Sequence, residues 1–130
     1  MSEFSKSLAV SASGLNAQSA RLRHLSENIS NADTPGYRRK LVSFEAELNG
    51  GDGVSRVEPG RVRLDKTELE RVYDPSHPLA DETGHYDGSN VNLLIELADA
   101  REAQRSYEAN LKMFEQARTM SANLLKLLQR

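Results

Sequence analysis

The sequence contains no cysteine among its 130 residues. Disulfides, thiol catalysis and thiolate metal sites are therefore excluded. Tryptophan is also absent, and aromatic residues make up only 5% of the chain, although ligand pockets are usually lined by aromatic and other bulky apolar side chains. A hydrophobic content of 38% is low for a large self-contained core. The composition favours helices that pack on something else.

Neither sign of charge dominates, because 17 basic residues stand against 19 acidic ones. Without a basic face, nucleic acid is not an expected partner. No apolar run approaches the roughly 20 residues of a membrane-spanning helix. The start, Met1-Ser2-Glu3-Phe4, lacks the basic residues and apolar run of a secretory signal. We therefore expect a soluble chain that carries no cleaved signal peptide and does not use the general secretion route.

Catalytic motifs are missing: there is no nucleophile elbow, phosphate-binding loop or His-Glu-x-x-His helix. Asp74, His77, Asp81 and His85 are the only cluster that resembles metal ligands, and their spacing matches no zinc pattern. Solvated loop histidines explain them better. We expect no catalytic residue, no metal, no cofactor and no small-molecule substrate. The chain is predicted not to be an enzyme.

The N-terminal segment has an apolar residue at every seventh position, which predicts a helix with a heptad stripe. These residues are Leu8, Leu15, Leu22 and Ile29. A companion row beginning at Phe4 is interrupted by Ser11 and Gln18. Because helices gain most of their stability by burying an apolar face, this thin stripe should become ordered only when a partner covers it.

The C-terminal segment shows the strongest periodicity of the chain, with spacings of four and three that predict a second heptad helix. The stripe comprises Leu93, Leu97, Ala100, Gln104, Tyr107, Leu111, Phe114, Arg118, Ser121, Leu125 and Leu128. Asn90 or Asn92 can cap this helix. Its length would be roughly 55 Å, so it should project beyond any small middle domain.

Thr34-Pro35-Gly36-Tyr37 predicts a turn that ends the first helix. Proline suits the first central position of a type II turn, and glycine supplies the positive φ of the second. Asn28 and Asn31 precede the turn, and such residues can satisfy the unpaired carbonyls of a helix end.

The middle of the chain predicts a small β-rich patch. Short β-branched segments at Val54–Val57 and Arg61–Leu64 are separated by Glu58-Pro59-Gly60, which resembles a hairpin turn. Glu68–Tyr73 can add a strand, and Asn49-Gly50-Gly51-Asp52-Gly53 predicts a loop across which residues 38–48 can pair.

The expected fold is therefore mainly α, with terminal heptad helices that pair as a coiled-coil-like bundle and a β-hairpin region between them. We expect an N-terminal assembly helix over residues 1–33, a middle segment of turn, strands and loop over 34–89, and a C-terminal assembly helix over 90–130.

Several motifs resemble those of bacterial flagellar basal-body rod and hook proteins. In the first third these are Ser13-Gly14-Leu15-Asn16-Ala17-Gln18, Asn28-Ile29-Ser30-Asn31 and Thr34-Pro35-Gly36-Tyr37-Arg38-Arg39. The later part is similar to proximal-rod proteins of the FlgC type in Asp74-Pro75-Ser76-His77-Pro78-Leu79-Ala80-Asp81, Asn90-Val91-Asn92 and Arg105-Ser106-Tyr107-Glu108-Ala109-Asn110-Leu111.

The resemblance implies a structural subunit of the axial rod, the drive shaft for motility. It also implies partners among copies of itself and other rod proteins, transient contact with the flagellar type III export apparatus, and a place in the basal body within the periplasmic space. The expected assembly interface is Leu8, Leu15, Leu22, Ile29, Leu93, Leu97, Tyr107, Leu111, Phe114, Leu125 and Leu128, and the expected signature turn is Asn28, Asn31, Thr34, Pro35, Gly36 and Tyr37.

Three alternatives stay open on the sequence. The chain could be another flagellar axial protein, or a cytosolic coiled-coil adaptor that forms a closed dimer with one partner. The third is a small metal-dependent hydrolase that uses Asp74, His77 and His85.

Overall fold

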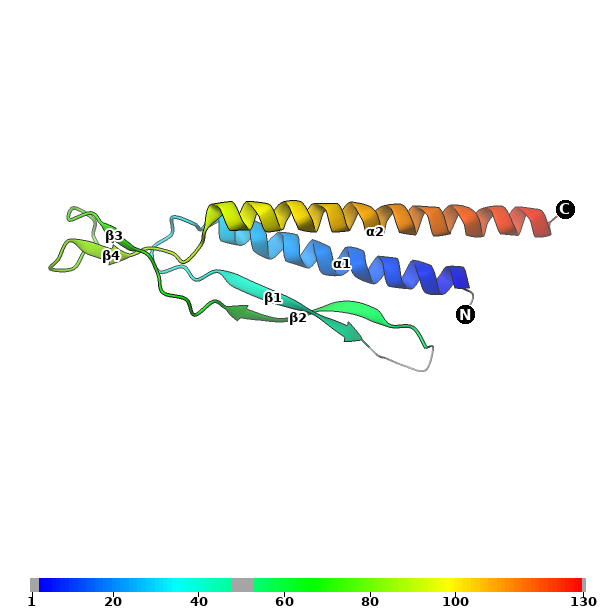
Figure 1. The fold of residues 1–130 in the computed structure, drawn as a ribbon, viewed down its shortest axis with the longest axis horizontal. Coiled ribbons are helices and arrows are strands. Elements are labelled where there is room, and N and C mark those ends of the chain that lie inside the picture. The colour runs from blue at the N-terminus through cyan, green and yellow to red at the C-terminus, as the bar shows by residue number, and fades with distance from the viewer. Residues whose placement is uncertain (1–2, 48–52, 130) are drawn as a thin grey trace.

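Two long antiparallel helices and a β-hairpin lie side by side along an extended molecule (Figure 1). The computed structural model describes residues 3–47 and 53–129. The elements are α1 (Glu3–Ser30), β1 (Lys40–Glu47), β2 (Arg56–Leu64), β3 (Arg71–Tyr73), β4 (His85–Asp87) and α2 (Leu93–Leu128). No helix within the described residues is long and apolar enough to cross a membrane. The predicted fold class, paired terminal helices around a small β-rich insert, is confirmed.

The two helices meet along a seam of residues that repeat at every seventh position in each helix. In α2 the seam consists of Glu96, Ala100, Ala103, Tyr107, Asn110, Phe114, Ala117 and Ser121, all buried or half-buried. The fully buried members on the α1 side include Ser11, Gly14 and Asn28. Small side chains let the helices approach closely: a Cβ at Gly14 would lie 2.6 Å from Oδ1 of Asn110.

One of the two rows of this seam is displaced by one residue from the stripe that the leucines predicted, while the row that contains Tyr107 and Phe114 lies where it was expected. Glu96, Ala103 and Ala117 face α1, whereas the expected Leu97 and Leu111 are exposed. In α1, Ser11 is buried although it looked like an interruption of the stripe. The physical reason is that Gly, Ala and Ser allow a closer backbone approach than leucine, which moves the leucines to the flank of the pair.

A polar side chain satisfies free backbone groups at the start of α2 and at the end of α1. Asn92, one of the two predicted caps, accepts hydrogen bonds from the backbone N–H groups of Leu94 and Ile95 at the start of α2. At the end of α1, the Asn31 side chain donates to the carbonyl of Glu27 at 2.9 Å. These bonds complete helices whose terminal turns otherwise lack intrahelical partners.

The predicted pairing of residues 38–48 across the glycine-rich loop is confirmed, but the predicted turn at Glu58-Pro59-Gly60 is wrong, because β2 runs straight through it. β1 and β2 are antiparallel, with Lys40 opposite Leu64 and Glu47 opposite Arg56. The register shifts between Val42 and Phe44, next to the Phe44–Pro59 pair. This irregularity accommodates a proline that could not take part in a regular ladder. Of the predicted loop, Asn49-Gly50-Gly51-Asp52 lies outside the described residues.

A second antiparallel ribbon, formed by the three-residue strands β3 and β4, lies beyond the end of the helix pair (Figure 1). The predicted strand at Glu68–Tyr73 is present in its last three residues, and Val72 pairs with Tyr86 of β4. The sequence did not predict β4, because Gly84 and Gly88 around it indicated a loop. A three-residue strand is too short for period-two patterning to reveal.

Replacing Ala103 with leucine tests the seam. Ala103 is fully buried between the helices, and overpacking should lower the free energy of unfolding of the purified chain by about 1–3 kcal/mol. Urea unfolding followed by helical circular dichroism measures the change. Ala109→Leu, on the exposed side of the same helix, should change it by less than about 0.5 kcal/mol. Equal effects of the two substitutions would contradict the seam.

Candidate functional site

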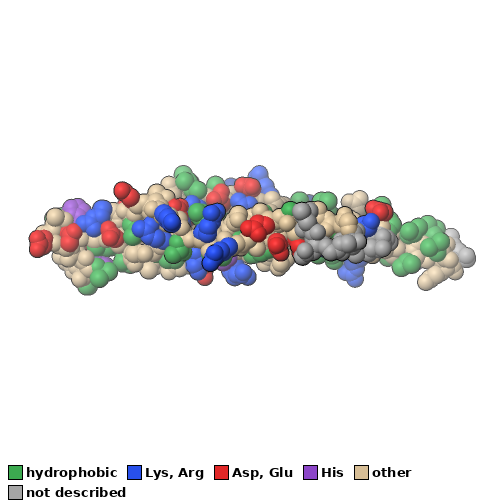
Figure 2. All heavy atoms as spheres, turned by 90° about the horizontal axis from the view of Figure 1, so that it is seen from below, with side chains coloured by type: hydrophobic (Ala, Val, Ile, Leu, Met, Phe, Trp, Pro, Cys, Tyr) green, Lys and Arg blue, Asp and Glu red, His purple; other side chains and the backbone are tan. Residues whose placement is uncertain are grey.

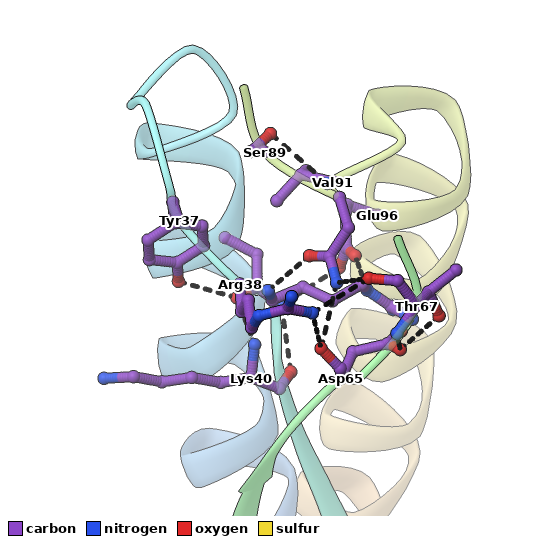
Figure 3. A network of polar contacts seen from close by, with 11 residues as sticks. Tyr37, Arg38, Lys40, Asp65, Thr67, Ser89, Val91 and Glu96 are labelled. Atoms are coloured by element: carbon purple, nitrogen blue, oxygen red, sulfur yellow. Dashed lines mark hydrogen bonds and ion pairs between the residues drawn. The ribbon is translucent and has the colours of Figure 1, made fainter. Parts of the chain in front are cut away.

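A polar joint connects the end of α1, the start of β1 and the start of α2 (Figure 3). Its side chains come from four separate segments of the chain: Asn28, Tyr37–Lys40, Asp65–Thr67 and Asn90–Glu96. Contacts between such distant segments hold the two helices and the hairpin in one arrangement. The joint is therefore the first candidate for a functional constraint.

Asn28 lies at the centre of the joint and is completely buried. Its Oδ1 accepts hydrogen bonds from the Tyr37 hydroxyl and the Lys40 backbone N–H, both at 2.8 Å. Its Nδ2 donates to the Lys40 carbonyl at 3.0 Å and to the Glu96 carboxylate at 3.4 Å. The side chain therefore uses both ends of its amide to tie α1 to the first residue of β1 and to α2.

Glu96 is a fully buried carboxylate on the seam of α2. Its Oε1 accepts a hydrogen bond from Nε of Arg39 at 2.5 Å, and Arg39 also pairs with Asp65 at 3.2 Å. Burial works against the charge of Arg39, but the bonds to Glu96 and Asp65 prevail and raise its pKa. Because a buried charge is costly unless it is paired, Glu96 and Arg39 depend on each other.

Asn90 and Arg38 hold the segment that follows the hairpin. Asn90 accepts from the Arg39 backbone N–H at 2.7 Å and donates to the carbonyl of Asp65 at 3.0 Å. Arg38 donates to the carbonyl of Thr67 at 2.9 Å. Hydrogen bonds from Thr67, together with the Arg39 guanidinium, lower the pKa of the Asp65 carboxyl group. The chain therefore leaves the hairpin in a defined direction.

The predicted turn over Thr34–Tyr37 is confirmed. The Tyr37 N–H donates to the Thr34 carbonyl at 3.2 Å, and Gly36 has a φ of 75°, as the second central position of a type II turn requires. The Gly36 N–H also donates to the carbonyls of Asp87 at 3.2 Å and Gly88 at 3.0 Å. The turn thus binds the second ribbon as well as ending α1.

The leucine rows form a second candidate surface, on one flank of the seam. In each helix the leucine row consists of residues that come one position after a residue of the seam. Because the helices are antiparallel, these two leucine rows lie on the same side of the pair. We call this surface the leucine face, and it comprises Leu8, Leu15, Leu22, Ile29, Leu97 and Leu111. The α1 members are half-buried, and Leu97 and Leu111 are exposed.

The hairpin lies on the other flank. The hollows between the hairpin and the helices are lined by Val10, Ala17 and His24 of α1 and by Asp99 and Asn110 of α2. Figure 2, which views the molecule from the hairpin side, shows a mixed surface of charged, polar and apolar side chains there. The leucine face therefore lies on the flank of the helix pair away from the hairpin.

The expected assembly residues divide into three groups in the structure. Tyr107 and Phe114 lie on the seam and are half-buried against α1. Six others form the leucine face, while Leu93, Leu125 and Leu128 are exposed near the ends of α2. Sequence reasoning missed the partners of Asn28, above all Glu96. A lone carboxylate within the apolar run Leu93-Leu94-Ile95-Glu96-Leu97 was the available signal.

The cluster that resembled metal ligands is held by other contacts. His77 stacks on Tyr86 with ring centroids 3.9 Å apart, and Asp81 pairs with Arg71 at 2.6 Å. Hydrogen bonds from Thr83 and the Arg71 guanidinium lower the pKa of Asp81. Across residues 3–47 and 53–129, no group of three or more His, Asp or Glu side chains is placed to hold a metal ion.

Comparison with known proteins gives a consistent result. The flagella basal body rod protein family matches residues 8–38, and the flagellar basal body rod FlgEFG protein C-terminal family matches residues 82–127. The flagellar basal-body rod protein FlgC of Agrobacterium fabrum is 46% identical over 99% of this chain and 98% of that protein. The FlgC proteins of Salmonella typhimurium and Bacillus subtilis are each 32% identical, over 91% and 93% of this chain and 92% and 95% of their own lengths.

A double-mutant cycle tests the joint. Arg39→Met should lower the free energy of unfolding by about 3–5 kcal/mol, because it leaves Glu96 buried and unpaired. Adding Glu96→Met should recover a large part of that loss, since both charges are then gone. The control Arg71→Met removes the exposed ion pairs with Asp81 and Asp87 and should cost less than about 1 kcal/mol. Urea unfolding measures the two single variants Arg39→Met and Glu96→Met, the double variant and the control, and additive losses at Arg39 and Glu96 would refute the coupling.

Proposed function

Because the chain belongs to the flagellar basal-body rod proteins of the FlgC type and is a structural subunit of the rod, we propose that its leucine face binds neighbouring rod subunits. The observation that carries this proposal is the position of the leucines. Apart from Tyr107 and Phe114, the seam of α2 consists of small or polar residues, and the leucines of the leucine face lie beside the seam and not in it. An exposed apolar face of this kind is typical of an interaction surface.

Each helix contributes one row of the leucine face, and both rows are available to a neighbouring subunit. Leu15 and Leu22 represent the α1 side, and Leu97 and Leu111 the α2 side. A helix from another subunit could pack between the two rows and bury both. Repeated contacts of this heterologous type extend into an open helical assembly instead of a closed dimer, as a rod requires. Tyr107 and Phe114 contribute indirectly, by holding α1 against α2.

We assign different roles to the parts of the chain. Residues 1–33 and 90–130 act as the assembly helices, and residues 34–89 form the outer segment. The joint around Asn28 and Glu96 would set the angle between them, because its hydrogen bonds reach α1, α2 and the hairpin. A buried ion pair resists bending better than exposed contacts would. This rigidity suits a subunit that transmits torque.

The proposal extends to the setting of the protein. The subunit would act without catalysis or a small-molecule substrate, in the part of the basal body that crosses the periplasmic space. It would reach that place through the flagellar export apparatus, with which it has only transient contact. Kinship with rod proteins supports these points.

Charge on the leucine face should block assembly. Leu15→Asp or Leu111→Asp places a carboxylate where a neighbour's apolar surface would cover it, and burying an unpaired charge is costly. We expect at least a tenfold loss of rods per cell and of swimming, with the chain still soluble. Counting basal bodies in purified preparations by electron microscopy measures this.

The matched control is Ala109→Asp, which adds the same charge to the exposed side of α2 away from the leucine face. It should leave rod number within about twofold of the wild type. Normal motility of the Leu111→Asp strain, or equal losses in all three strains, would reject the proposed interface. A closed dimer of the purified chain would favour an adaptor instead.

The turn at Gly36 gives a second test. Gly36→Val should disturb rod assembly more than hairpin stability, because a β-branched residue resists a φ of 75°. Open space surrounds the position of a Cβ at Gly36, so backbone strain and not a clash would cause the effect. Gly36→Asn is the control, since asparagine tolerates positive φ. Rod counts are compared with amide hydrogen exchange of β1 and β2, and a normal count for Gly36→Val would leave the turn a simple helix stop.

A further inference from the structure

The C-terminal end of α2 extends past the described part of α1 (Figure 1). Glu3, where α1 begins, lies beside Met120, and α2 continues from there to Leu128. The extension carries four exposed leucines, with 45% of Leu124, 57% of Leu125, 65% of Leu127 and 74% of Leu128 accessible. We call these four residues the leucine overhang.

The overhang continues the seam. From Ala117 and Ser121 the same spacing of four and three leads to Leu124 and Leu128. Between Glu96 and Ser121 the seam of α2 contains no leucine, so its two largest aliphatic residues stand where α1 no longer covers them. A heptad seam without a facing helix leaves its strongest apolar positions in water.

The overhang is also wider than the seam. Leu125 and Leu127 flank Leu124 and Leu128, and only Lys126 in this run of five is polar. On a helix these four leucines cover both inward positions and the position on each side of them. An apolar arc of that width matches a surface made by two helices better than the edge of a single helix.

We propose that the leucine overhang of one subunit binds the leucine face of a neighbouring rod subunit, at the end of that face formed by Ile29 and Leu97 and next to the exposed Leu93. This inference rests on the proposed function, because it identifies which part of a neighbour meets the leucine face. The partner is a rod subunit with the same two-helix architecture. The contact lengthens the α1–α2 seam across the boundary between subunits.

The end near Ile29 fits best for two reasons. Leu93 and Leu97 of α2 are exposed at this end of the pair, and Ile29 of α1 is half-buried, so both helices carry aliphatic side chains here. Further along α2 the row that begins at Leu97 contains Gln104 and Arg118, which would place polar groups against the overhang.

The contact has a direction. The overhang is at the end of the helix pair where α2 ends, and the site that receives it is at the opposite end, beside the joint (Figure 1). Such a head-to-tail contact is heterologous and cannot close between two subunits. It would therefore add subunits along a line.

Site-specific photocrosslinking in assembled basal bodies tests this contact. A benzophenone amino acid replaces Leu128 in the full-length chain, basal bodies are purified after irradiation, and crosslinked peptides are identified by mass spectrometry. We expect the product to join position 128 to residues 22–32 or 91–98, or to the equivalent residues of a related rod protein. Leu127 is the second labelling position, in case the label at Leu128 prevents incorporation.

Lys126 is the matched control, because it lies in the same turn and faces away from the seam. A label there should give at least tenfold less of the same product. Products from position 128 that map to other parts of a rod subunit, or no product in rods that contain the labelled chain, would overturn the inference while leaving the rod function intact. Absence of even the unsubstituted chain from purified rods would overturn the proposed function itself.

A pair of variants supplies an independent readout. Leu124→Ser combined with Leu128→Ser should leave the urea midpoint of the purified chain unchanged, since neither side chain is covered by α1, and should reduce incorporation into rods at least tenfold. Lys126→Ser should change neither quantity by more than about twofold. Normal incorporation of the double variant would overturn the inference.

Discussion

Close contact between α1 and α2 through small side chains is the constraint on which the rest of the structure depends. Gly14 packs against Asn110 with no room for a Cβ, and Ser11 and Ala103 are buried in the same seam. A seam of this composition buries little apolar area, so the pair gains less from hydrophobic burial than a leucine zipper would. The larger apolar residues are consequently placed outside, where they are available to other subunits. Modest stability of the subunit and an apolar exterior thus have the same cause.

The polar joint compensates for the thin seam at one end of the pair. Asn28 and Glu96 occupy seam positions that a typical helix pair would fill with apolar residues, and each is satisfied by several partners. Buried polar groups tolerate few alternative arrangements, because any displacement leaves a donor or acceptor unpaired. Here they select one register of the helices and one direction of the hairpin. At the other end of the pair there is no comparable network among the described residues, and exposed leucines take its place.

The sequence allowed the prediction of both helices, of the turn at Pro35-Gly36 and of the Asn92 cap, since each depends on local periodicity or on the backbone preference of one or two residues. Predictions about pairing were less accurate. Glu58-Pro59-Gly60 has the composition of a turn, yet the strand passes through it because a register shift absorbs the proline. The strand at His85–Asp87 exists only because it meets Arg71–Tyr73. In both cases the deciding contact lies many residues away in the sequence.

By itself the sequence determined the element types, the heptad rows and the resemblance to rod proteins, because these are carried by residue identity and spacing. Only the tertiary structure decided which row of each helix faces the other and which is left open. Periodicity defines an apolar stripe, but two adjacent rows satisfy the same seven-residue repeat. The choice between them depends on how closely two backbones can approach, and that is a property of the pair. The same reason explains why the polar joint could not be foreseen: Arg39, Asp65, Asn90 and Glu96 converge near Asn28 only after the chain has folded.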